Sequence, residues 1–139
     1  MTKHYSSGQG LNAKLLSGIN KLADNVGSTL GPKGRNVILF HKEQNTPVIT
    51  KDGVTIAKFV EFEDPFENVG AQIVKQAAEQ SANNAGDGTT TTTVLARGII
   101  NRAQKYITAG VSPIELKRGM DTTTTQIVSR LEEMSRPIQ

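Results

Sequence analysis

Apolar residues early in the chain recur at the spacing of an amphipathic helix. Over residues 11–26 this pattern is carried by Leu15, Ile19, Leu22, Ala23 and Val26. It stops before "TLGPKG" at residues 29–34, whose glycine and proline do not continue a helix. The first predicted element is therefore a helix that ends at this turn.

Two short runs rich in β-branched residues come next. "NVILF" at residues 36–40 and "PVIT" at residues 47–50 flank the polar segment "HKEQNT". Such a pair predicts a β-hairpin with a longish loop. After the turn "KDG" at residues 51–53, the run "VTIAKFV" indicates a third strand.

The rest of the chain predicts three helices. "DPFE" at residues 64–67 has Asp64 as N-cap, proline at the first helical position and glutamate three residues after the cap. The helix that it opens ends near residues 85–86. Its expected apolar face consists of Val69, Ile73, Val74, Ala77 and Ala78.

A further helix starts within the threonine run at residues 89–93 and continues toward Gly110. The last helix starts at "SPIE", residues 112–115, which has the sequence of a second capping box. The last helix includes "TTTT" at residues 122–125 and ends at "SRPIQ". The expected apolar positions are Val94, Leu95, Ile99 and Ala103 in the former helix, and Leu116, Met120, Ile127, Val128, Leu131 and Met134 in the latter. The predicted fold class is mainly α: a helical bundle with a small β-hairpin after the first helix.

Composition and charge narrow the function classes. The chain has 139 residues, which suits one domain, and a formal net charge of +3. No run of lysine or arginine exceeds two, and no aromatic residues interleave with them, so nucleic-acid binding is not favoured. There are no cysteines and no apolar stretch near the ~20 residues that span a bilayer. We expect a soluble, cytoplasmic protein with no membrane or nucleic-acid partner.

The segment "AGDGTTTTTVL", residues 85–95, is a glycine-bracketed loop that leads into a helix N-terminus. The first amides of a helix lack intrahelical partners and form a natural anion site. Threonine hydroxyls can add donors to phosphate oxygens, whereas Asp87 suits the site only if a divalent cation bridges it to phosphate. The alternative is that the aspartate and threonines merely cap the helix.

Two other loops bear on that choice. "TLGPKGRN" at residues 29–36 follows the predicted C-terminus of the first helix, whose orphan carbonyls can hold a cation or a ribose hydroxyl. "ITKDGVTI" at residues 49–56 holds Asp52 in a tight turn, where it can orient water toward a phosphoryl group. An ordinary Asp-Gly turn is the alternative for this loop.

Five segments together carry a family resemblance: "TLGPKGRNVIL", "ITKDGVTIAK", "FENVGAQIVK", "AGDGTTTTTVLA" and "LKRGMD". Their order and approximate spacing resemble those of a group I chaperonin, the bacterial and organellar 60-kDa type, over about residues 14–137. Group II chaperonins share the "GDGTTT" segment, but "GPKGRNVIL" and "ENVGAQIVK" resemble group I. The resemblance implies that residues 1–139 form the N-terminal part of an equatorial ATP-binding domain, without the intermediate and apical domains.

The resemblance also implies roles for individual residues. The implied nucleotide pocket is lined by Thr29, Leu30, Gly31, Pro32 and Lys51, and the backbone of Lys51 lies near a bound K⁺. The implied Mg²⁺ ligand is Asp87, the implied phosphate contacts are Gly88, Thr89, Thr90 and Thr91, and the carboxylate associated with positioning the attacking water is Asp52. The hairpin over about residues 36–50 matches a stem-loop that reaches a neighbouring subunit.

The function implied is ATP-driven protein folding in a homo-oligomeric ring. The apical domain would bind unfolded proteins. Whether a co-chaperonin is a further partner is left open. ATPase activity is expected of a full-length chaperonin, whereas the 139 residues alone are not expected to hydrolyse ATP competently. The alternative is a truncated, non-catalytic interaction module that keeps the equatorial fold without hydrolysing ATP; weak nucleotide binding stays open for it.

Overall fold

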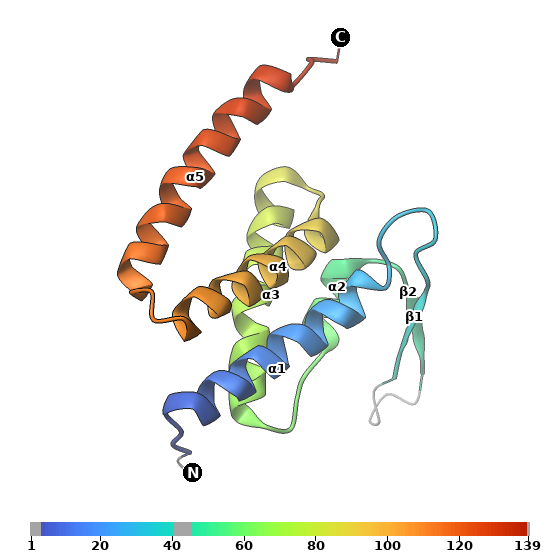
Figure 1. The fold of residues 1–139 in the computed structure, drawn as a ribbon. Helices are drawn as coiled ribbons and strands as arrows, with labels where there is room; N and C mark the ends of the chain where they lie inside the picture. The colour runs from blue at the N-terminus through green and yellow to red at the C-terminus, as the bar shows by residue number, and fades with distance from the viewer. Residues whose placement is uncertain (1–3, 41–45, 139) are drawn as a thin grey trace. The chain divides into compact units, whose positions relative to one another are not determined.

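The computed structural model describes residues 4–40 and 46–138, and these residues form helices and one hairpin (Figure 1). The chain divides into two compact units, Met1–Ile99 and Ile100–Gln139, with the boundary inside the fourth helix. The mainly-α fold class with a small hairpin after the first helix is confirmed. In chain order the elements are α1 (Gly8–Gly27), β1 (Val37–Leu39), β2 (Val48–Thr50), α2 (Gly53–Phe59), α3 (Pro65–Ala85), α4 (Thr89–Thr108) and α5 (Pro113–Met134).

The core of the first unit lies where α1 packs against α3, with α2 beside them. Two glycines allow a very close approach of the two long helices. A Cβ atom on Gly18 would lie 1.8 Å from the carbonyl oxygen of Glu67, and one on Gly70 would lie 2.1 Å from that of Leu15. The buried apolar residues of this core are Ile19, Leu22, Ala23 and Val26 of α1, Ile56 and Ala57 of α2, and Ala71, Val74 and Ala78 of α3.

Polar contacts at the edge of this interface hold the start of α3 against α1. Lys14 Nζ lies 2.7 Å from Asp64 Oδ2, and Lys21 Nζ lies 2.7 Å from Glu67 Oε2. Ser17 Oγ donates to Glu67 Oε1 at 2.8 Å. The lysines thus lower the pKa of both carboxyls, and Ser17 adds to the effect at Glu67.

The predicted hairpin is confirmed: β1 and β2 pair antiparallel, with Ile38 opposite Ile49. Most of its predicted loop, residues 41–45, lies outside the described residues. The predicted third strand is wrong, because "VTIAKFV" lies largely within helix α2. Asp52 caps that helix by accepting from the amides of Val54 and Thr55. The local cap, together with burial of one helical face against α1 and α3, outweighs the β propensity of the run.

A buried lysine fastens the other end of α2. Lys75 of α3 is 5% exposed and donates from Nζ to the carbonyl oxygen of Val60, the C-cap residue of α2, at 2.5 Å. Burial lowers the pKa of Lys75, while Glu61 and Glu79 oppose that shift. Both ends of this short helix are therefore held by side-chain hydrogen bonds.

Helix boundaries agree with the capping signals, with one exception. Asp64 is the N-cap of α3 and accepts from the amides of Phe66 and Glu67, and Gly86 ends the helix with a φ of 72°. Ser112 occupies the N-cap position of α5 but makes no side-chain cap hydrogen bond. The second capping box is therefore wrong as a hydrogen-bonded motif, although it marks the start of α5.

The predicted apolar faces are only partly correct. Val74 and Ala78 of α3 are buried, but Val69 and Ile73 are 51% and 49% exposed. In α4 the buried residues are Thr89 and Thr93 instead of the expected apolar ones, and no residue of α5 is buried. Periodicity identifies a helix, whereas burial depends on which of its faces has a neighbour.

Candidate functional site

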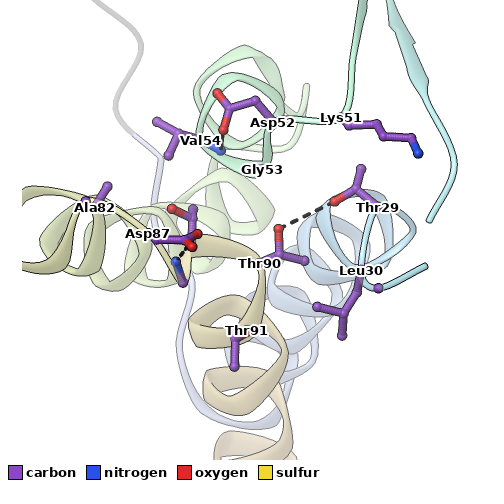
Figure 2. A pocket seen from close by; sticks show the side chains of 14 residues that line it. Thr29, Leu30, Lys51, Asp52, Gly53, Val54, Ala82, Asp87, Thr90 and Thr91 are labelled. Atoms are coloured by element: carbon purple, nitrogen blue, oxygen red, sulfur yellow. Dashed lines mark hydrogen bonds between the residues drawn. The ribbon is translucent and has the colours of Figure 1, made fainter. Parts of the chain in front are cut away.

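A pocket of about 310 Å³ lies in the first unit, where three loops meet (Figure 2). One loop follows α1, the second precedes α2 and the third connects α3 to α4. The lining residues are Thr29, Leu30, Gly31, Lys51, Asp52, Gly53, Val54, Ala82, Gly86, Asp87, Gly88, Thr89, Thr90 and Thr91.

The loop after α1 is a compact turn built on backbone hydrogen bonds. The amide of Thr29 donates to the carbonyl of Val26 at 3.2 Å. The amide of Arg35 donates to the carbonyl of Ser28 at 2.9 Å and closes the loop. Gly31 has a φ of 74°, which glycine adopts without steric cost. The Thr29 side chain is buried, and its Oγ1 donates to the carbonyl of Val26 at 2.7 Å. This wall of the pocket is therefore fixed to the last turn of α1.

The loop between α3 and α4 has two left-handed glycines, Gly86 and Gly88, on either side of Asp87. The carboxylate of Asp87 accepts from the amide of Gly88 at 2.6 Å, and the Asp87 carbonyl accepts from Ser81 Oγ at 3.2 Å. Helix α4 begins directly afterwards, at Thr89. The loop therefore brings an exposed carboxylate next to the first turn of a long helix, where backbone amides lack intrahelical partners.

Asp52 enters the pocket from the N-terminus of α2. Its carboxylate accepts from the Thr55 hydroxyl at 2.5 Å, from the Thr55 amide at 2.9 Å and from the Val54 amide at 3.3 Å. The Thr55 hydroxyl contributes most to lowering the pKa of Asp52, and the two amides add to it. The carboxylate is thus held in place and ionised at neutral pH, as a helix cap rather than a simple turn.

A contact between side-chain hydroxyls joins two of the walls. Thr29 Oγ1 and Thr90 Oγ1 lie 3.4 Å apart, as the dashed line in Figure 2 shows. In the same view the Lys51 side chain extends away from Asp87. Lys51 therefore contributes to the lining beside Asp52 without directing its amine at the Asp87 carboxylate.

The structure brings together all the residues singled out in the sequence except Pro32, which is not part of the lining. Three lining residues were not among the candidates, namely Gly53, Val54 and Ala82, whereas Gly86 was expected only as a glycine of the loop. The two glycines lie in the motifs "KDG" and "AGDG", so their loops carried a signal. Val54 and Ala82 have apolar side chains with no chemistry to mark them, and only the fold places them here.

The Asp87 carboxylate, next to the first turn of α4, suits a cation that is coordinated by both the protein and a bound phosphate. The part of the chain that the structure describes holds no group of three or more His, Cys, Asp or Glu residues that could bind a metal ion. Mg²⁺ commonly takes one or two protein carboxylates and completes its shell with water and substrate phosphates. Asp87 beside the first turn of α4 fits that type of site.

The fold and the site define a class of protein: a largely helical domain with a pocket that glycines and threonines line. Residues 22–139 match the family model described as the TCP-1/cpn60 chaperonin family. The chain therefore belongs to this family, and its general function is that of a chaperonin, in protein folding. Membership implies ring oligomers and unfolded-protein clients in general terms. Among the helices within residues 4–40 and 46–138, none combines the length and the hydropathy of a membrane span.

Proposed function

We propose that this chain is the ATP-binding segment of a group I chaperonin, which uses ATP binding and hydrolysis to drive protein folding in a ring. The observation that carries the proposal is the meeting of the 29–31 and 86–91 loops around one pocket, with the Asp87 carboxylate at its edge. A nucleoside triphosphate with its bound cation offers phosphates, a bridging metal ion and a ribose. These are the groups that the two loops and the Asp87 carboxylate suit. A cytoplasmic location belongs to the same proposal, since a chain without cysteines fits a reducing compartment.

The phosphates would lie at the first turn of α4. There the amides and hydroxyls of Thr89, Thr90 and Thr91 supply donors, and Gly88 lets the backbone approach closely. Asp87 would hold Mg²⁺, which neutralises phosphate charge and removes the repulsion between phosphate and carboxylate. The segment 29–32 would contact the nucleoside side, and the backbone near Lys51 would hold K⁺.

Asp52 would position the attacking water. Its cap hydrogen bonds fix the carboxylate at the pocket and keep it ionised, so it can accept a hydrogen bond from water near a phosphoryl group. Phosphoryl transfer depends mainly on such positioning and on charge stabilisation. Asp52 therefore suits a role in hydrolysis more than a role in affinity.

The group I assignment rests on sequence segments outside the shared threonine loop. "GPKGRNVIL" forms the turn after α1 and the start of the hairpin, and "ENVGAQIVK" forms the part of α3 that packs on α1. In the second segment Gly70 meets the backbone of Leu15, so this sequence also serves the helix interface.

The experiment is isothermal titration of ATP into the purified chain with Mg²⁺ and K⁺ present, repeated after each cation is removed. Saturable binding that disappears without Mg²⁺ supports the proposal. Binding that is indifferent to Mg²⁺, or no binding at all, contradicts it. GTP in a parallel titration tests whether the adenine base is recognised.

A second candidate is an interaction module that keeps the fold without hydrolysing ATP. The exposure of the hairpin favours it: the opposed pair Ile38 and Ile49 is 68% and 65% exposed. Exposed apolar side chains on a two-stranded ribbon suit contact with another protein. Phosphate release from ATP in the assembled protein separates the two candidates, because the second one keeps the fold without hydrolysing ATP.

A further inference from the structure

Gly53 lies against the last turn of α1 and the first turn of α4, next to the pocket residue Asp52. It is the first residue of α2, it is buried, and it follows the cap residue Asp52. A Cβ atom built on Gly53 would lie 2.6 Å from Thr90 Oγ1 and 3.2 Å from Val26 Cγ1. It would also lie 3.5 Å from the backbone nitrogen of Thr90. The missing side chain therefore leaves the space that the Thr90 hydroxyl occupies.

Backbone conformation does not explain this glycine. The glycines with positive φ are Gly8, Gly31, Gly86, Gly88 and Gly110, and Gly53 is not one of them. Alanine can therefore adopt the Gly53 backbone conformation without strain. What alanine cannot do is leave room for Thr90.

The neighbours of Gly53 have little freedom to move. Thr90 is β-branched and lies in the first turn of α4, where few side-chain rotamers are allowed. Its Oγ1 also contacts Thr29 Oγ1, which donates a hydrogen bond to the carbonyl of Val26. Val26 itself is fully buried. An added methyl group would therefore displace the start of α2 relative to the first turn of α4.

We propose that Gly53 is a positioning residue for the nucleotide site: by lacking a side chain, it sets the separation between Asp52 and the threonines of α4. The inference rests on the proposed ATP-binding function and deepens it. Gly53 needs no contact with the nucleotide, because it acts through the position of Thr90. A larger residue would leave the phosphate donors present but displaced from the Asp52 carboxylate.

The test is the variant Gly53→Ala, compared with Gly98→Ala. Gly98 is a helical glycine of α4, and a Cβ atom there meets nothing within 4 Å. Isothermal titration with Mg-ATP is expected to show a dissociation constant about tenfold higher for Gly53→Ala, equivalent to about 1.4 kcal/mol. Gly98→Ala is expected to bind ATP as the unsubstituted chain does.

A double-mutant cycle with Thr90→Ala identifies the route of the effect. Thr90→Ala removes the hydroxyl that the new methyl group would meet, so Gly53→Ala is expected to change ATP affinity little in that background. The double variant also relieves the closest clash, which keeps the comparison open if Gly53→Ala alone folds poorly. Equal fold-changes in both backgrounds would overturn the inference.

The outcomes also separate this inference from the function on which it rests. Absence of ATP binding by the unsubstituted chain overturns the proposed function and the inference with it. ATP binding that Gly53→Ala leaves unchanged overturns the inference alone. Urea unfolding of each variant shows whether a change in affinity exceeds any change in folded population.

Discussion

The side-chain hydroxyls of Thr29 and Thr90 lie 3.4 Å apart, although 61 positions separate the two residues in the chain. Thr29 lies at the start of the loop that follows α1, and Thr90 lies in the first turn of α4. Their contact joins two glycine-containing loops, each of which could be explained by itself as a helix end. Together with Asp52 at the start of α2, the joined loops enclose one pocket.

Replacing the Asp87 carboxylate by an amide should remove Mg²⁺-dependent ATP binding. Asp87→Asn keeps a side-chain oxygen that can accept from the Gly88 amide, so the loop is expected to stay folded. It removes the charge that Mg²⁺ requires, and the ATP dissociation constant should rise at least about tenfold. Isothermal titration measures this effect. Asp121→Asn, an exposed residue of α5 paired with Lys117, is the control and should bind ATP unchanged.

Two substitutions at Asp52 should separate its role as a helix cap from its charge. Asp52→Ala loses the bonds to Val54 and Thr55 and should lower the free energy of unfolding by about 1 kcal/mol. Asp52→Asn is a good N-cap and should keep nearly all of that stability. Urea unfolding measures both variants.

In an assembled chaperonin, each Asp52 variant should slow phosphate release at least tenfold, which corresponds to at least about 1.4 kcal/mol of activation free energy, with little change in ATP affinity. Phosphate release and ATP titration are measured on the same preparations. Equal losses of rate and affinity would contradict the water-positioning role.

A methyl group at Gly70 should destabilise the interface of α1 with α3. The added Cβ would lie 2.1 Å from the Leu15 carbonyl oxygen, which is backbone and cannot rotate away. Gly70→Ala is expected to lower the free energy of unfolding by about 1–3 kcal/mol, because the helices must separate. Gly98→Ala has open space and should raise stability by roughly 0.5–1 kcal/mol through helix propensity. Similar urea midpoints for the two variants would show that the close approach is absent.

Stability should fall in acid because of the carboxyls at the α1–α3 edge. Lys21 lowers the pKa of Glu67 in the folded chain, and Lys14 lowers that of Asp64. The unfolded state then binds protons at a higher pH than the folded state does. The stabilisation is therefore present above about pH 4, the ordinary range of these carboxyls, and is lost as the pH falls through their folded pKa values.

Urea unfolding between neutral pH and about pH 2 measures this dependence on protonation. Glu67→Gln should flatten it, because the amide cannot gain a proton. Glu133→Gln is the matched control, since Glu133 forms an exposed pair with Arg130 within α5. A profile that Glu67→Gln leaves unchanged would contradict the role of the Lys21 pair.

Several features of this protein were predictable because their causes lie within a few neighbouring residues. The Asp64 side chain accepts hydrogen bonds from the amides of Phe66 and Glu67, and Gly86 adopts a left-handed conformation. Both are local properties, so the ends of α3 followed from the sequence. The hairpin followed from two β-branched runs around a polar segment. The resemblance to chaperonins likewise depends on short motifs, and the family match over residues 22–139 agrees with it.

The errors have the opposite origin. The run after Asp52 has the residues of a strand, yet it is helical because Ile56 and Ala57 find burial against α1 and α3. Val69 and Ile73 lie at the expected helical spacing, but the face of α3 that meets α1 is centred on Gly70 and Val74. Backbone contact at a glycine offers closer packing than a row of larger apolar side chains would.

The sequence by itself determined which segments are helical ends, which loops are rich in glycine and hydroxyls, and which family the chain resembles. Only the tertiary structure decided that Thr29, Asp52 and Asp87 line one pocket, and that Gly53 must leave room for Thr90. The physical reason is range. Capping and turn hydrogen bonds act over three or four residues, whereas burial and steric fit depend on partners far away in the chain.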